Sequence, residues 1–234
     1  TQDVSGCEVV SATSRVEIVP APMITTQPEI LQVLCLNGTV NPLSVAFTNG
    51  TGTVSYQWYS NTVDDTSSGT LISGATMSSY TPPNTPTGAI FYYCELTFSQ
   101  GGCSSILTNT AQVDIVPLPT ISTQPTVIQD ICEGGVIIPL SIAVTGGTGT
   151  ITYQWYSNTT NSNTGGTAIS GATLDSYTPP VFSTAGNFYF YAVATLDGIG
   201  CGSTASDVSE VNVVLDPDVT VQPLADQTHC QGAT

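Results

Sequence analysis

The chain has 234 residues, and Arg15 is its only basic residue against seventeen acidic ones, so the formal net charge is −16 at pH 7. Nucleic acids and anionic membrane surfaces are bound through cationic patches, so this composition argues against both as partners. No run of about eighteen apolar residues occurs, which argues against membrane insertion. No signal peptide is present, so we expect a piece of a longer, extracellular chain rich in uncharged polar residues.

The chain is a tandem repeat with a period of about 97 residues. The segment Tyr56–Asn61 (YQWYSN) recurs as Tyr153–Asn158, and both copies are followed by ISGAT and SYTPP. The repeat predicts two complete domains flanked by two partial ones. The predicted divisions are the end of a preceding repeat (1–21), two full repeats (22–118 and 119–216) and the start of a following repeat (217–234).

Short apolar segments alternate with turn residues every eight to twelve positions, which predicts an all-β fold. In the first repeat, an edge strand at 24–28 precedes a strand at 43–47 and, after a Gly/Thr turn, a strand at 55–60 that carries Trp58. A polar loop at 63–69 and two short strands follow. A long strand at 90–98 and a last strand ending at 116 complete the repeat, and the second repeat has the same order.

The two tryptophans are expected in the core. Period-two alternation turns Trp58 and Trp155 inward, which favours packing over the alternative, a platform for stacking sugars. Tyr59 and Tyr156 point the other way and are better candidates for external contacts, although half-exposed residues of a sheet are the simpler interpretation.

A core tryptophan that faces the strands on either side is the immunoglobulin arrangement. Val45 and Ile142 stand where the first intersheet cysteine usually lies, and Cys94 stands at the second position, which Ala192 takes in the next repeat. The usual intersheet bond is therefore absent. The sequence predicts tandem immunoglobulin-like β-sandwich repeats of about 97 residues, each with one displaced disulfide.

The remaining cysteines follow the repeat. Cys35, Cys132 and Cys230 are early in a repeat, whereas Cys7, Cys103 and Cys201 are late. We predict the bonds Cys35–Cys103 and Cys132–Cys201, which imply an oxidising compartment, and a buried free thiol at Cys94. A Cys35–Cys94 bond is the alternative pairing. A zinc site is disfavoured because no Cys-x2-Cys pair occurs and the one histidine is remote from most cysteines.

No metal ion, cofactor or catalytic residue is predicted. Asp64–Asp65 and Asp216–Asp218 are the alternative ligands for calcium, but neither set recurs in the other repeat or linkers. The glycine turns fit hairpins, and the sequons at Asn37, Asn49 and Asn158 fit chance. Without lysine, and with one histidine, a serine nucleophile lacks a base, so we expect no enzyme.

The order Gln-Pro, Cys, Gly/Thr turn, Tyr-Gln-Trp-Tyr, Ile-Ser-Gly-Ala-Thr, Tyr-Thr-Pro-Pro, Phe-Tyr and Gly-x-Cys resembles the immunoglobulin-like repeats of giant Bacteroidota surface adhesins. The resemblance is closest to the SprB-type gliding-motility adhesins. It implies an extracellular, type IX-secreted filament that envelope motors move along the cell surface.

The expected function is therefore a structural stalk fragment of a long cell-surface adhesin used in gliding and attachment. Its expected partners are neighbouring repeats of the same chain, with an external surface, glycan or protein as the ligand. The alternative is a glycan- or protein-binding immunoglobulin-like module of a secreted or matrix protein, which would use the loops between strands.

Overall fold

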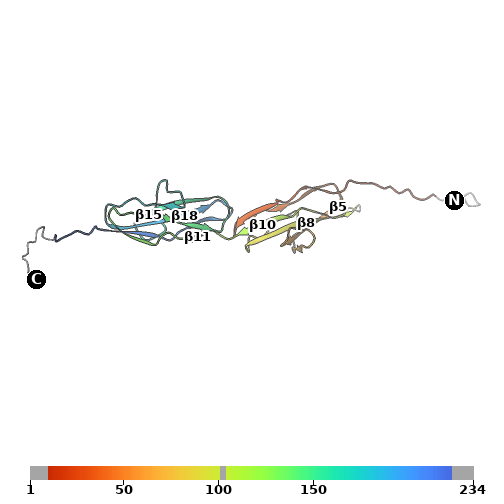
Figure 1. Cartoon of the computed structure of the whole chain (residues 1–234). Coiled ribbons are helices and arrows are strands. Elements are labelled where there is room, and N and C mark those ends of the chain that lie inside the picture. Colours follow the sequence, from red (N-terminus) through yellow and green to blue (C-terminus); the bar gives the residue numbers. More distant parts are fainter. Residues whose placement is uncertain (1–9, 101–103, 223–234) are drawn as a thin grey trace, which may run out of the picture. The chain divides into compact units, whose positions relative to one another are not determined.

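The computed structural model describes residues 10–100 and 104–222, and the described residues form strands and loops without an α-helix (Figure 1). No described segment therefore forms a helix that could cross a lipid bilayer. The chain divides into two compact units, Thr1–Ile115 and Val116–Thr234. Each unit is a sandwich of two layers of strands.

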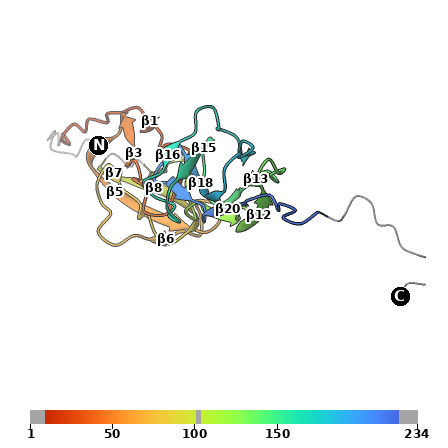
Figure 2. The ribbon, with the colours of Figure 1, turned by 90° about the vertical axis from the view of Figure 1, so that its left-hand side faces the viewer.

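In the first unit the larger sheet has the strand order β2-β10-β8-β5-β6, with β9 also pairing with β8. The smaller layer consists of the pairs β1–β4 and β3–β7, in which β3 and β4 are separated by Val45 alone. Figure 2 shows β1 and β3 on one side of this unit and β5, β8 and β6 on the other. The strands are β1 (Met23–Thr26), β2 (Leu31–Cys35), β3 (Leu43–Ser44), β4 (Ala46–Thr48), β5 (Thr51–Asn61), β6 (Thr70–Leu71), β7 (Ser79–Tyr80), β8 (Gly88–Gln100), β9 (Ile106–Leu107) and β10 (Ala111–Val116).

The second unit repeats this topology, with the larger sheet in the order β12-β20-β18-β15-β16, β19 paired with β18, and a smaller layer of β11–β14 and β13–β17. Its strands are β11 (Thr120–Thr123), β12 (Ile128–Cys132), β13 (Leu140–Ser141), β14 (Ala143–Thr145), β15 (Ile151–Asn158), β16 (Thr167–Ala168), β17 (Ser176–Tyr177), β18 (Gly186–Leu196), β19 (Gly202–Ala205) and β20 (Ser209–Val214).

The core lies between the two layers because alternate residues of the long strands face inward. Trp58 on β5 is opposite Cys94 on β8, and Trp155 on β15 is opposite Ala192 on β18. All four side chains are fully buried. Apolar packing thus replaces the usual intersheet disulfide at this level of both sandwiches. The all-β, tandem immunoglobulin-like fold predicted from the sequence is confirmed.

The chain enters and leaves the second unit at opposite ends of the sandwich. At the entrance, the Gly147 N–H donates to the Pro117 carbonyl at 2.8 Å, and a Cβ on Gly147 would contact Leu196, the last residue of β18. At the exit, Val213 on β20 is opposite Gly186, the first residue of β18. Ten steps along a strand separate these levels, or about 33 Å.

In the first unit, too, the chain enters at one end of the sandwich and leaves at the other. A Cβ on Gly50 would contact both Phe98, near the end of β8, and Pro22, near the start of the repeat. At the other end, Ile115 on β10 is opposite Gly88, the first residue of β8. The φ of +86° at Gly50 and its contact with the Phe98 ring both require glycine, so this turn fixes the entrance end. Each sandwich therefore spans the distance between its own incoming and outgoing chain.

Candidate functional site

The two tryptophans are structural and offer no face to a ligand. Trp58 and Trp155 are both 0% exposed, and their indole N–H groups donate to the carbonyls of Met77 at 2.9 Å and Leu174 at 3.0 Å. Tyr80 and Tyr177 lie against them, each with its ring centroid 6.0 Å away. Because each indole has its polar atom satisfied and its rings covered, a role in sugar stacking is ruled out.

The outer face of the larger sheet carries a stacked pair of tyrosines in each repeat. Tyr59 lies flat on Tyr93 with centroids 5.0 Å apart and ring planes 8° apart, and its hydroxyl donates to Glu95 at 3.1 Å. Tyr156 stacks on Tyr191 with the same separation. One face of Tyr59 is therefore used within the domain rather than for an external contact.

In each repeat the loop that follows the strand of Tyr59 (β5) or Tyr156 (β15) closes over the stacked pair. A Cβ on Gly69 would come within 2.6 Å of the Tyr93 ring, so only glycine allows the loop to approach this closely. In the second repeat the Gly166 N–H donates to the Tyr191 hydroxyl at 3.1 Å. Sequence reasoning missed Tyr93 and Tyr191 because it considered Tyr59 and Tyr156 without their partners on the neighbouring strand.

The acidic pair expected as an alternative calcium ligand is engaged in hydrogen bonds. Thr110 donates its hydroxyl to Asp64, and Asp65 accepts from the Ser68 hydroxyl at 2.6 Å and from the Ser67 hydroxyl at 2.8 Å. Among the described residues, no group of three or more His, Cys, Asp or Glu side chains lies close enough together to hold a metal ion. These carboxylates order the polar loop of the first repeat.

The Asp65 loop should be weakened by acid, because hydrogen bonds from Ser68 and Ser67 stabilise the carboxylate and lower the pKa of Asp65. A lowered pKa contributes stability above the ordinary value of about 4, and this contribution is lost as the pH falls through the lowered pKa. A carboxyl NMR titration should give a midpoint below that ordinary value. The variant Ser68→Ala should raise the midpoint, and an unchanged midpoint would contradict the assignment. The acid-free loop at 159–166 is the internal control.

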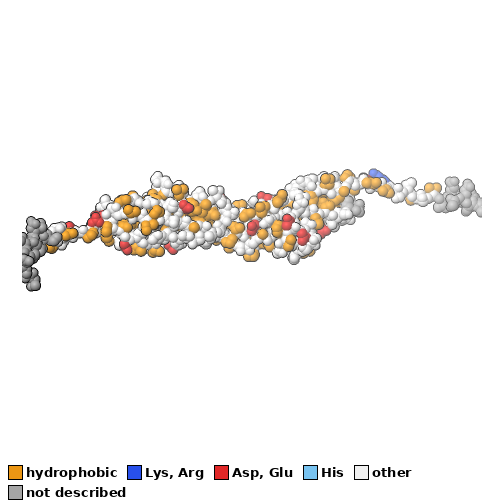
Figure 3. Space-filling model, viewed as in Figure 1, with side chains coloured by type: hydrophobic (Ala, Val, Ile, Leu, Met, Phe, Trp, Pro, Cys, Tyr) orange, Lys and Arg blue, Asp and Glu red, His pale blue; other side chains and the backbone are white. Residues whose placement is uncertain are grey.

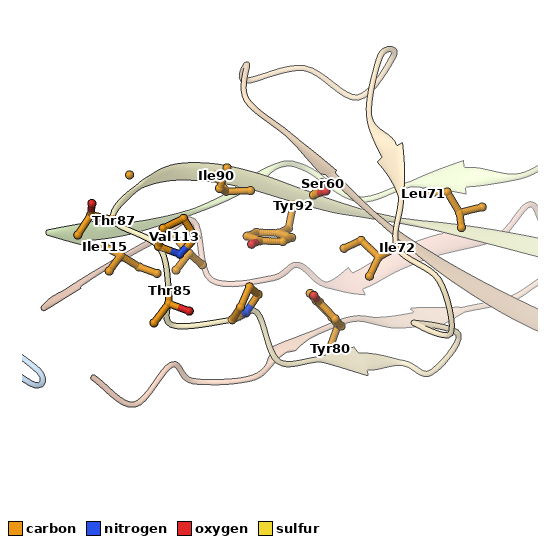
Figure 4. Close-up of a pocket in the computed structure, with 13 residues that line it drawn as sticks. Ser60, Leu71, Ile72, Tyr80, Thr85, Thr87, Ile90, Tyr92, Val113 and Ile115 are labelled. Carbon is orange, nitrogen blue, oxygen red and sulfur yellow. The ribbon is translucent and has the colours of Figure 1, made fainter. Parts of the chain in front are cut away.

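A pocket of about 450 Å³ opens at the exit end of the first repeat (Figure 4). It lies between the two layers, and the side chains of Tyr80, Tyr92, Ile72 and Val113 surround it. The corresponding pocket of the second repeat is smaller, about 330 Å³, and Phe182 and Phe188 stack there with centroids 3.8 Å apart. The pocket is missed by sequence reasoning because five of its thirteen lining residues lie in loops.

The described cysteines fall into two states. Cys35 and Cys201 each take part in a disulfide, whereas Cys94 and Cys132 are free thiols. The predicted Cys132–Cys201 bond is therefore wrong, and its physical reason is that these residues lie at opposite ends of the second sandwich. The alternative Cys35–Cys94 bond is wrong too, because Cys94 is free. The predicted partner of Cys35, Cys103, lies outside the described residues.

Cys94 should be unreactive in the native chain. Burial raises the pKa of its thiol to about 12, so almost no thiolate forms at neutral pH. Alkylation at about pH 8 should modify the exposed Cys132 in the native chain and Cys94 only after unfolding. Peptide mass spectrometry separates the two sites, because Asp and Glu residues flank both. Rapid native modification of Cys94 would contradict its placement beside Trp58.

The visible surface carries few charges. Figure 3 shows uncharged polar and hydrophobic side chains over most of one face, with isolated acidic residues between them. Arg15, the only basic residue, lies 3.3 Å from Glu17 in an exposed ion pair, so it neutralises one of the acids locally. No part of this face gathers the positive charge that a polyanion would need.

Comparisons with known proteins place these domains in a family. The family model described as Domain of unknown function (DUF8696) matches residues 27–117 and, a second time, residues 122–215. No curated protein matches the chain.

Solved structures give the fold. A titin I67–I69 variant with three immunoglobulin domains is similar with a TM-score of 0.50 and 14% identity, covering 86% of this chain and 67% of that one. Sidekick-1 immunoglobulin domains 1–4 are similar with a TM-score of 0.47 and 15% identity over 86% of this chain. The chain spans about half (51%) of the Sidekick-1 fragment. At such identities the titin likeness shows the immunoglobulin-like fold and nothing further. The two matched ranges together cover most of the sequence, and the chain therefore belongs to the DUF8696 family, of which it contains two copies.

Proposed function

We propose that this chain is part of the structural stalk of a long, repetitive cell-surface adhesin, of the kind that bacteria use for gliding and surface attachment. The observation that carries the proposal is that the chain enters and leaves each sandwich at opposite ends. Because the chain enters at one end and leaves at the other, about 33 Å away, every added repeat lengthens the molecule by one folded spacer.

The chemistry of the described residues fits a spacer outside the cell. Cys35 and Cys201 each take part in a disulfide, which fits an oxidising environment. The side chains that sequence analysis considered for binding or metal coordination are instead engaged within each domain: the tryptophans in the core, the tyrosines in stacked pairs and Asp64–Asp65 in loop hydrogen bonds. The resemblance to gliding adhesins supports type IX secretion and motor-driven movement.

The alternative, a glycan- or protein-binding module, has one observation in its favour. The pocket of the first repeat is wider than that of the second, where Phe182 and Phe188 stack. A binding site specialised in one repeat would produce such a difference between the pockets of the two repeats. Phe182 is matched by Thr85 in the first repeat, so filling that pocket with Thr85→Phe should abolish binding by such a module and leave a spacer unaffected.

The deciding experiment is made on living cells of the source organism. An antibody against this chain, carrying fluorophores or beads, is followed along the cell surface. A stalk of a motile adhesin should carry the label along the cell, and blocking antibody should reduce attachment. A label that stays fixed or is shed would overturn the motile role and leave the immunoglobulin-like fold untouched.

A further inference from the structure

We propose that the pocket of the first repeat binds the side chain of a tyrosine carried by another protein. This pocket, of about 450 Å³, opens between the two layers of the sandwich, at the end where β8 begins (Figure 4). A sandwich that serves only as a spacer needs no such pocket. The proposal therefore goes beyond the stalk role and does not depend on it, because a spacer repeat can also carry a binding site.

The walls of the pocket are apolar and uncharged. Ile90 and Tyr92 line it from β8, Val113 and Ile115 line it from β10, and the loop at 83–87 closes the other side (Figure 4). None of the lining residues carries a charge. Pockets of this size and chemistry hold apolar groups, which they remove from water, and use a few polar atoms to fix the orientation of the ligand.

One buried polar group in the pocket has no partner within the repeat. Only 4% of Tyr92 is exposed, and its hydroxyl makes no hydrogen bond to any residue that the structure describes. Tyr80 lies beside it, with ring centroids 5.8 Å apart. Burial raises the pKa of Tyr92 to about 12, so the hydroxyl keeps its proton at neutral pH and can donate. Buried polar groups normally have a partner, so this hydroxyl points to an oxygen of a ligand.

The second repeat shows what the pocket accepts. There Phe182 lies in the equivalent pocket and stacks on Phe188 with ring centroids 3.8 Å apart and ring planes 15° apart. Phe190 takes the place of Tyr92, so the ring of Phe182 has no hydroxyl beside it to satisfy. In the first repeat the segment at 83–87 contains no aromatic residue. The second repeat thus supplies its own aromatic ring, whereas the first has room for a ring from outside and a hydroxyl to bind it.

A tyrosine side chain matches both features of the first pocket. Its ring can pack between the apolar walls as Phe182 does, and its phenolic oxygen can accept a hydrogen bond from Tyr92. A phenylalanine would leave the Tyr92 hydroxyl unpaired, and a sugar would bury several hydroxyls against isoleucine and valine. The net charge of −16 favours a partner segment that is neutral or basic.

The first test uses the whole chain and a short, neutral, capped peptide with one tyrosine. Methyl NMR signals of Ile72, Ile90 and Val113 should shift saturably on titration. The same peptide with phenylalanine should bind about twofold to tenfold more weakly, the value of one hydrogen bond, and the leucine peptide should cause no saturable shift. No saturable shift with the tyrosine peptide would overturn the proposal. Binding of p-cresol, the side chain alone, without binding of the peptide would also overturn it, because the ring must arrive on a chain.

Variants of the first pocket separate the ring from the hydroxyl. Tyr92→Phe introduces the residue that the second repeat has at this place, and it should erase the preference for tyrosine over phenylalanine. Thr85→Phe places a ring in the pocket and should abolish binding. The matched control Val181→Phe adds a ring at an exposed position of the second repeat and should change nothing. A preference for tyrosine that survives Tyr92→Phe would contradict the assigned hydrogen bond.

The reciprocal variant should create a site. Phe182→Ala removes the internal ring of the second repeat, and the methyl signal of Ile169, which lines that pocket, should then shift as well. Tyrosine and phenylalanine peptides should bind this new site equally, because Phe190 has no hydroxyl. An unchanged unfolding transition of Trp155 shows that the variant is folded. A folded variant that binds no peptide in its second repeat would refute the inference that these pockets accept an aromatic ring.

Discussion

Removal of a core tryptophan should cost one repeat a large part of its stability. The change Trp155→Ala deletes a fully buried indole and its hydrogen bond to Leu174, and such losses cost about 3–5 kcal/mol through lost burial and the cavity left behind. A domain of this size has an unfolding free energy of about 5–15 kcal/mol. Denaturant unfolding followed by circular dichroism should show the second repeat melting far earlier.

Each repeat supplies the other's control, because each contains one tryptophan. In Trp155→Ala, the fluorescence of Trp58 reports the first repeat alone. The transition of the first repeat should stay where it is in the wild-type chain. The milder change Trp155→Phe keeps an aromatic ring in the core and should cost less than Trp155→Ala. A loss below about 1 kcal/mol for Trp155→Ala would contradict a packing role.

The strands and the core could be predicted because they depend on local periodicity. Alternation on β5 and β15 places every second side chain inward, so Trp58 and Trp155 were assigned to the core from sequence. The absence of the usual intersheet bond was equally visible, since Val45 and Ala192 cannot form one. These predictions needed only the order of residues within one strand.

The cysteine pairing could not be predicted because it depends on the direction of non-local pairing. The period shows that Cys35 and Cys132 are equivalent but not at which end of the sandwich they lie. The parallel pairing of β12 with β20 places Cys132 at the exit, whereas the turn after β18 places Cys201 at the entrance.

The separation of entrance and exit in each sandwich has a consequence for how a repeat bears tension. A pull applied where the chain enters and leaves one sandwich acts along its long strands, and the hydrogen bonds between strands lie perpendicular to them. Many of these bonds are therefore loaded together in shear, so a repeat should resist force until several of them break at once.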